Sequence, residues 1–222
     1  MRYYIRYFTM QKKQNTASIH NQHVPVLDEN SVNADPVKQF SSWFDDARKF
    51  GVPEPEAMFL ATAGMDGIPS GRMVLLKGFD DRGFVFYTNY GSRKGREINE
   101  NPHATIVFFW KEMNRQVRIT GKVSKVTSRE SDAYFATRSL ESRIGAVISV
   151  QSHVIPGRKY LEEKFDVYLK KDPELLKRPK KWGGFRIRPD RIEFWQERPH
   201  RLHDRILYRK IRRNWIIERL SP

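Results

Sequence analysis

The stretch AMFLATAGMDGIPSGRMVLLKGFDDRGFVFYTN, residues 57–89, decides the fold class of this chain. It contains three apolar runs, Ala57–Ala63, Arg72–Phe79 and Phe84–Asn89, separated by short turns rich in Asp and Gly. Consecutive strands joined by a few residues pair antiparallel, because a parallel pair needs a long crossover connection. Several of the runs are apolar on both faces, which is typical of a closed or doubly covered sheet. We therefore expect a small antiparallel barrel.

The strand pattern continues towards the C-terminus. Further strands are expected at Ala104–Trp110, Gln116–Val126, Gly183–Arg188, Ile192–Trp195, Arg205–Lys210 and Trp215–Leu220. No repeat, low-complexity tract or clear second domain appears along the chain. We therefore expect one α+β domain, residues 35–222, preceded by a mobile N-terminal arm, residues 1–34.

Helices flank the expected sheet. Asp35 and Pro36 form a helix start, in which Asp caps and Pro occupies the first helical position, and Gly51 ends that helix. Thr127 and Glu130 have capping-box spacing, so a helix should begin at Ser128 and run to about Arg138. Other helices are expected at Ser92–Asn99, Ser142–Val150 and Arg158–Lys170.

The composition limits the class of protein. None of the apolar runs among the 222 residues approaches the roughly 20 needed to span a bilayer, so no membrane partner is expected. The chain has no cysteine, which removes disulfides and thiolate chemistry and fits a reducing compartment. A cytoplasmic location is therefore preferred, although the aromatic and basic stretch Met1–Met10 resembles a mitochondrial transit peptide enough to keep that alternative.

The formal charge of +15 points to an anionic partner. Nucleic acid and phosphorylated small molecules both fit such a charge, and composition does not separate them. The chain lacks a Gly-x-Gly-x-x-Gly turn and a Walker loop, so neither a dinucleotide nor a nucleoside triphosphate is held in those standard ways. His200 and His203 have no further ligand nearby, so no metal is expected.

Three groups of donors could bind phosphate. Arg72 and Lys77 bracket an apolar strand, where an unpaired charge would be costly to bury. Ser92, Arg93 and Lys94 open a short helix, whose N-terminal amide groups favour an anion. The third group is Tyr134, Arg138 and Ser142, which share one side of a helix if the helix continues that far. Each group taken alone could equally be a set of solvated surface charges.

A fourth group is harder to explain by folding alone. Arg201, His203, Asp204 and Arg205 fall within five residues at the start of a strand, and imidazole exchanges protons near neutral pH. This group favours a site that binds a ligand or moves a proton.

These groups, in this order, resemble the pyridoxamine 5'-phosphate oxidase family. The similarity runs from about Asp35 to Pro222, and the most specific motif is Arg201-Leu-His-Asp-Arg205 preceded by Glu193-Phe-Trp-Gln196. The other matching segments are Asp35–Phe40, Gly71–Gly78, Ser92–Gly95, Asn114–Arg118, Gln151–Ser152, Trp182–Gly184, Ile192–Gln196 and Glu218–Leu220.

The resemblance implies an FMN-binding split β-barrel and a homodimer with FMN at the subunit interface. The FMN contacts that it implies are Arg72, Met73, Val74, Leu75, Tyr87, Thr88, Arg93, Lys94, Gln116, Gln151, Ser152, Trp195 and Arg205. The implied substrate residues are Lys77, Tyr134, Arg138 and Ser142 for the phosphate, and Arg201, Leu202 and His203 near the pyridine ring.

The implied activity is that of a pyridoxal 5'-phosphate synthase, an oxidase acting on CH–NH2 donors in vitamin B6 metabolism. A hydride leaves the C4' carbon of pyridoxine or pyridoxamine 5'-phosphate for flavin N5, and oxygen then reoxidises the flavin to give hydrogen peroxide. Arg201 and His203 would be the catalytic pair. Nucleic acid is then not expected as a partner.

The chain departs from the family pattern at Glu197, where Gly is expected, and at Ser139, where Pro is expected. These departures keep one alternative open, a split-barrel protein that binds flavin or pyridoxal 5'-phosphate without catalysis. A nucleic-acid-binding protein is the other alternative, although no strand shows the aromatic and basic pattern of an oligonucleotide platform.

Overall fold

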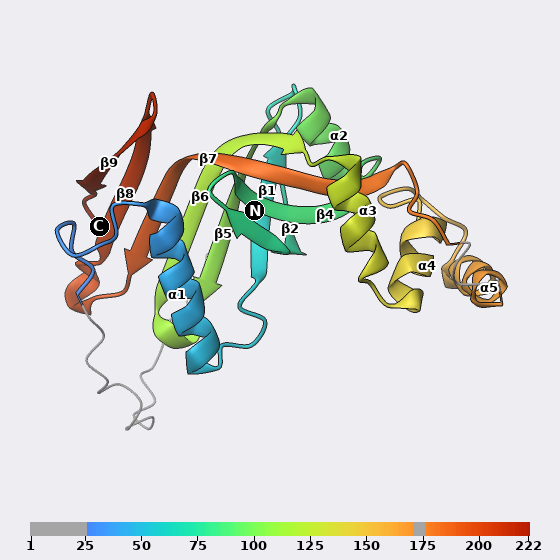
Figure 1. Ribbon diagram of the computed structural model, residues 1–222, viewed down its shortest axis with the longest axis horizontal. Coiled ribbons are helices and arrows are strands. Elements are labelled where there is room, and N and C mark those ends of the chain that lie inside the picture. The colour runs from blue at the N-terminus through green and yellow to red at the C-terminus, as the bar shows by residue number, and fades with distance from the viewer. Residues whose placement is uncertain (1–25, 171–175) are drawn as a thin grey trace, which may run out of the picture.

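The computed structural model describes residues 26–170 and 176–222, and its backbone is dominated by one curled antiparallel sheet (Figure 1). The strands are β1 (Ala57–Ala63), β2 (Pro69–Leu75), β3 (Gly78–Asp80), β4 (Gly83–Asn89), β5 (His103–Trp110), β6 (Arg115–Lys125), β7 (Trp182–Gln196), β8 (Asp204–Ile211) and β9 (Asn214–Arg219). Their order is β2-β1-β5-β6-β7-β4-β3, with β8 paired to β7 and β9 paired to β8.

The sheet curls into a half-barrel, and its two outermost strands are neighbours in sequence. Only Leu76 and Lys77 separate β2 from β3, and the Lys77 amide donates a hydrogen bond to the Val85 carbonyl at 2.8 Å. The expected single strand Arg72–Phe79 is therefore wrong in one respect, since it divides here. The break is what lets one chain segment serve both edges of the sheet. The α+β antiparallel barrel itself is confirmed.

The helices are α1 (Pro36–Phe50), α2 (Arg93–Glu100), α3 (Ser128–Ala136), α4 (Leu140–Ile148) and α5 (Arg158–Leu169), with short 3-10 turns at Lys111–Met113 and Pro199–Arg201. The predicted Asp35 cap of α1 is confirmed, because its carboxylate accepts from the Val37 amide at 2.8 Å. The capping box is confirmed as well, since Thr127 and Glu130 exchange side-chain and backbone hydrogen bonds.

Helix α1 fills the barrel opening with aromatic side chains. Phe40 is fully buried, and its ring lies 4.9 Å from that of Phe84 and 5.1 Å from that of Phe108. Burial of each such side chain contributes about 1.5–3 kcal/mol. This core fixes the strands on which the site residues are placed.

Strand β7 joins two ends of the molecule. Its first half pairs with β4 and its second half with β8, while β6 runs beside it along most of its length. Figure 1 shows α3–α5 at one end of the long axis and the β8–β9 hairpin at the other. The two strands expected at Gly183–Arg188 and Ile192–Trp195 are thus one continuous strand, with a register shift opposite Thr120 and Gly121.

Part of the expected N-terminal arm, residues 1–34, lies outside the described residues. Its last part packs on the barrel: Leu27 is buried, and the Tyr208 hydroxyl donates to the Asn33 carbonyl at 2.7 Å. Among the described residues no helix is both long enough and apolar enough to cross a bilayer.

Candidate functional site

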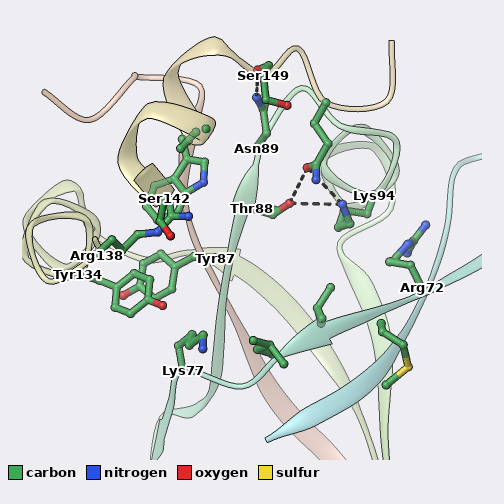
Figure 2. A pocket seen from close by; sticks show the side chains of 17 residues that line it. Arg72, Lys77, Tyr87, Thr88, Asn89, Lys94, Tyr134, Arg138, Ser142 and Ser149 are labelled. Atoms are coloured by element: carbon green, nitrogen blue, oxygen red, sulfur yellow. Dashed lines mark hydrogen bonds between the residues drawn. The ribbon is translucent and has the colours of Figure 1, made fainter. Parts of the chain in front are cut away.

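A pocket of about 680 Å³ opens between β2, β4, α3 and α4 (Figure 2). Its size suits a cofactor or a drug-sized ligand. Twelve of the residues expected at the site line it, namely Arg72, Met73, Val74, Leu75, Lys77, Tyr87, Thr88, Lys94, Tyr134, Arg138, Ser142 and Gln151. The sequence therefore located this pocket from segments far apart in the chain.

One side of the pocket holds a buried lysine. Lys94 is 7% exposed, and the described residues offer its ammonium group only neutral oxygens: Thr88 Oγ1 at 3.3 Å, Ser92 Oγ at 3.4 Å and Gln151 Oε1 at 3.4 Å. Burial lowers the pKa of Lys94, and the nearby positive charge of Arg72 lowers it further. Within the described residues Lys94 forms no ion pair, so the ammonium group is available to an anion.

Arg72 lies on the same side as Lys94 and is held by a buried carboxylate (Figure 2). Its Nη2 atom lies 3.3 Å from Glu97 Oε2 and donates to Ser70 Oγ. Burial acts to raise the pKa of Glu97, but hydrogen bonds from Ser70, Thr62, Arg93 and Arg72 lower it to about 2. Glu97 is therefore ionised throughout the neutral range.

The other side of the pocket holds the third donor group (Figure 2). The Arg138 guanidinium lies 4.7 Å from the Trp182 ring centroid, in cation–π geometry. Its Nη1 atom is buried without a hydrogen-bond partner, and burial lowers the pKa of Arg138. A buried donor without a partner is costly, so this atom is suited to an anionic ligand oxygen. Lys77 and Ser142 line the pocket nearby.

The helix expected to run through Arg138 ends earlier. Helix α3 stops at Ala136, and Ser139 caps a new helix by accepting from the Ser142 amide at 3.3 Å. The expectation that one helix carries all three residues on one side was therefore wrong, although Tyr134, Arg138 and Ser142 do line one pocket. The turn between α3 and α4 brings them together instead of helix periodicity.

Stacked aromatic rings form a wall beside this donor group. The Tyr87 ring lies 3.9 Å from the Tyr134 ring and 5.5 Å from the Trp182 ring, both in stacked geometry. Such stacking fixes the positions of the two phenol rings. A planar ligand would meet a preformed surface here.

The pocket fits the two groups that the resemblance implies. Its two sides each carry a cation that lacks a carboxylate partner among the described residues, Lys94 on one and Arg138 on the other. The pocket thus matches FMN held by its phosphate on one side and a phosphorylated substrate held on the other.

Six expected site residues lie elsewhere on the chain. None of the six lines this pocket. Gln116 lies on β6, Trp195 on β7 and Arg205 on β8, and the Pro199–Arg201 turn with the two residues after it carries Arg201, Leu202 and His203. Figure 1 places β8 at the opposite end of the molecule from α3 and α4. Within one chain, the structure therefore does not bring the two sets together.

The second set forms an ordered cluster of its own. The His203 ring lies 4.8 Å from the Trp195 ring, and its Nδ1 accepts from the Arg198 amide at 3.2 Å. Arg205 Nε donates to Glu193 Oε1 at 2.9 Å. His200 and Arg201 both have positive φ angles, 60° and 63°, a conformation that costs non-glycine residues energy and is concentrated at functional sites.

The remaining two expected contacts, Arg93 and Ser152, do not line the pocket. Arg93 is tied to Glu97 through its Nε atom at 2.8 Å, and Ser152 is exposed with a φ of 70°.

Sequence reasoning missed several residues that shape the site. The missed lining residues are Asn89, Gly145, Ala146, Ser149 and Trp182. Trp182 belongs to the matching Trp-Gly-Gly segment, which was the available signal. Glu97 was also missed, and its position four residues after Arg93 on a helix could have indicated the pairing.

Comparison with known proteins gives consistent matches along the chain. Residues 44–171 match the family model described as pyridoxamine 5'-phosphate oxidase. Residues 182–222 match the pyridoxine 5'-phosphate oxidase C-terminal dimerisation region. The pyridoxine/pyridoxamine 5'-phosphate oxidase of Cupriavidus taiwanensis is 54% identical over 89% of this chain and 93% of its own length. That of Trichormus variabilis is 52% identical over the same shares.

Solved structures agree with these matches. PhzG from Burkholderia lata, in complex with tetrahydrophenazine-1-carboxylic acid, superposes with a TM-score of 0.85 at 31% identity and covers 90% of this chain and 98% of its own. A pyridoxamine 5'-phosphate oxidase-related FMN-binding protein from Nostoc punctiforme has a TM-score of 0.67 at 19% identity, covers 85% of this chain and 98% of its own, and supports the fold alone.

Proposed function

The chain belongs to the pyridoxine/pyridoxamine 5'-phosphate oxidase family, and on that premise we propose that it oxidises both phosphorylated vitamers to pyridoxal 5'-phosphate. Oxygen is the second substrate, hydrogen peroxide is released, and the amine substrate also gives ammonia. FMN, when bound, accepts the hydride. The observation that carries the proposal is the pair of uncompensated cations, Lys94 and Arg138, on two sides of one pocket.

The chain's own residues bind and orient. Arg138, Lys77, Tyr134 and Ser142 hold the substrate phosphate, and the buried Nη1 of Arg138 gains the partner that it lacks. Binding of the phosphate by these residues would orient the substrate, so that its C4' carbon would face the flavin when FMN is bound.

Lys94 and Arg72 hold the phosphate of FMN at the start of α2, with Thr88 and Gln151 beside them. The amide groups at a helix N-terminus add favourable donors for this phosphate. Met73, Val74 and Leu75 supply the apolar contacts, with Tyr87 at the pocket wall.

The second cluster acts on the substrate ring. Because His203 Nδ1 accepts a hydrogen bond from the Arg198 amide, the neutral imidazole carries its proton on Nε2. The Nε2–H group of His203 can therefore donate a hydrogen bond to the substrate, while Arg201 and Leu202 position the pyridine ring. Trp195, Gln116, Arg205, Arg93 and Ser152 would complete the FMN site.

These roles require a homodimer with FMN at the interface, in which the second cluster of one protomer completes the pocket of its partner. Support comes from the match of residues 182–222 to a dimerisation region, because this segment carries the cluster. Further support is an apolar face on β1, β2 and β5: Phe59, Met73 and Phe109 are 44%, 63% and 59% exposed, and Phe59 pairs with Met73. Exposed apolar faces of this kind are typical of protein interfaces.

Residues 35–222 would act as a single oxidase unit, and residues 1–34 as an N-terminal arm whose described part packs on that unit. A cytoplasmic location is proposed on the lack of cysteine.

An absorbance spectrum tests the activity directly. Purified protein should be yellow, and pyridoxine 5'-phosphate should bleach the flavin absorption under anaerobic conditions, with colour returning on admission of oxygen. Protein that takes up FMN and is not bleached by either vitamer phosphate would favour the alternative, a flavin-binding protein without catalysis. Protein that takes up no FMN would refute both.

A further inference from the structure

We propose that Glu97 is a positioning residue for the FMN phosphate, which it serves by fixing Arg72 and Arg93 without touching the ligand. This inference rests on the proposed function, because it assumes that the phosphate of FMN is bound beside Lys94. Glu97 itself does not line the pocket.

The placement of Glu97 is unusual for an acidic side chain. It lies on α2, one turn after Arg93, and is only 8% exposed, whereas Glu100 on the same helix is exposed. A buried carboxylate is retained only where several donors compensate its lost hydration. Helix α2 therefore carries a buried negative charge beside the proposed anion site.

The donors around Glu97 come from three segments. Its Oε2 atom accepts from Thr62 Oγ1 at 2.5 Å and from Ser70 Oγ at 2.6 Å, while Arg72 Nη2 lies 3.3 Å away. Its Oε1 atom accepts from Arg93 Nε at 2.8 Å. One carboxylate thus cross-links β1, β2 and α2.

The cross-link leaves arginine donors free for a ligand. Arg93 uses only Nε within the described residues, so both of its Nη atoms are uncommitted. Arg72 uses Nη1 and Nη2 towards Thr62, Ser70 and Glu97, which holds its guanidinium in one orientation beside Lys94. A guanidinium that is already fixed loses little further freedom when an anion binds.

Two physical effects of Glu97 on an anion have opposite signs. Counting charge alone, removal of a carboxylate near a phosphate should strengthen binding. Removal of the group that fixes two arginines should weaken binding. A Glu97→Gln variant therefore distinguishes a positioning role from a bystander charge.

The experiment measures the dissociation constants of FMN and of riboflavin for the apoprotein by quenching of flavin fluorescence. Glu97→Gln should weaken FMN binding about tenfold or more, which is the worth of a charged hydrogen bond. It should leave the affinity for riboflavin, which has the same ring and no phosphate, within about twofold. Glu100→Gln removes one charge from the same helix and is the matched control, with neither constant changed.

The outcomes separate cleanly. Unchanged or tighter FMN binding by Glu97→Gln overturns the inference while leaving the proposed function intact. An equal loss for FMN and riboflavin also overturns it, because it indicates a structural defect. Wild-type protein that binds no FMN refutes the proposed function, and the inference with it.

A double variant tests whether Glu97 acts through Arg72. In an Arg72→Ala background, Glu97→Gln should have a clearly smaller effect on FMN binding than in the wild type, and an undiminished effect contradicts the coupling. If Glu97→Gln does not fold, Ser70→Ala replaces it, since Ser70 bonds to both Glu97 and Arg72. Ser70→Ala should cause a smaller, phosphate-specific loss, and equal FMN affinity in this variant overturns the inference.

Discussion

The two ends of the molecule use the same device to different effect. At the pocket end, buried Glu97 holds Arg72 and Arg93, and at the β8 end buried Glu193 holds Arg118 and Arg205. Each carboxylate fixes two cations on a rigid sheet or helix.

The difference lies in what surrounds each device. At the pocket end, a cavity of about 680 Å³ lies beside the arginines, with a wall of stacked rings. At the β8 end, Leu202 is 67% exposed and Arg201 is exposed too, and neither lines that pocket. This difference fits the proposed homodimer, in which the exposed cluster at the β8 end of one protomer would complete the pocket of its partner.

The largest expected effect comes from mixing two damaged chains. Arg138→Ala damages the pocket, and the double change Arg201→Ala with His203→Ala damages the cluster at the β8 end. At substrate concentrations below the wild-type KM, each variant alone should therefore keep only a small fraction of the wild-type rate. Suppose that every site combines the pocket of one protomer with the β8-end cluster of its partner. About half of randomly formed dimers are then mixed, and each mixed dimer has one intact site of two. Co-expression should therefore restore about a quarter of wild-type activity.

Steady-state oxidation of pyridoxine 5'-phosphate by the co-purified mixture, set against each variant alone, checks this prediction. A mixture no more active than its components would place both halves of the site on one chain.

A smaller effect is expected from the homodimer that carries Arg138→Ala as its single change. Loss of a charged hydrogen bond to the substrate phosphate should cost about 1.5–3 kcal/mol, mainly as a raised KM. Kinetics at varied substrate concentration give the value. Arg129, which is exposed and lies on α3 outside the pocket, provides the control variant Arg129→Ala. An unchanged KM for Arg138→Ala would remove this residue from the phosphate site.

At the other end, Glu193→Gln should lower the free energy of unfolding by about 1–2 kcal/mol. This loss is smaller than that for a fully buried ion pair, because the side chains of Arg118 and Arg205 are 48% and 26% exposed and water screens their charges. Denaturant unfolding of the variant checks this figure. Glu218→Gln, in the exposed pair with Arg209, should leave the free energy of unfolding nearly unchanged, because water screens this ion pair. Equal losses for the two variants would mean that burial of Glu193 adds nothing.

The smallest effect is a pH dependence at the pocket end. The pKa of Lys94 lies below the ordinary 10.5, through burial first and Arg72 second, while Glu97 opposes the shift. FMN phosphate favours the charged ammonium, so binding takes up a proton wherever free Lys94 is neutral. Affinity for FMN should therefore fall as the pH rises through this lowered pKa.

Titration of FMN affinity against pH measures that fall. The control is Lys94→Arg, in which the cation stays protonated and the decline should disappear. A decline of the same size in Lys94→Arg would assign it to another group.

Signals that act within a few residues were read correctly from the sequence. Asp35 with Pro36 and Thr127 with Glu130 determine helix starts through hydrogen bonds to nearby amides, so spacing alone predicts them. The donor groups that line the pocket were also found, because their charges on apolar segments demanded a partner. Local chemistry was enough for the helix starts, whereas the donor groups also needed the family resemblance, because each of them alone could equally be solvated surface charge.

Features set by distant contacts were not predictable in this way. The end of α3 before Arg138 depends on the Ser139 cap, and helical spacing cannot show where a helix stops. Pro189 and Asp190 resemble a turn, yet β7 continues through them as a bulge, because β6 pairs with Pro189 and Arg191 on either side of Asp190. The two sets of expected site residues lie at opposite ends of the molecule because of the order of the strands in the sheet. No sequence motif indicates that order.

The register shift in β7 has a consequence for the alternation of its side chains. Gly121 faces Pro189 and Thr120 faces Arg191, so one residue, Asp190, is left over between them. The core-facing positions are consequently odd-numbered before this residue, as at Phe185 and Ile187, and even-numbered after it, as at Ile192 and Phe194.

A chain lacking Asp190 would pair regularly with β6, and Ile192 and Phe194 would stay on the core face, because the two halves of β7 would then alternate as one. Such a strand would lose the local bend and the added twist that a bulge introduces. The extra residue therefore marks the point where β7 changes direction between the half that pairs with β4 and the half that pairs with β8, while the apolar side chains of both halves face one interior.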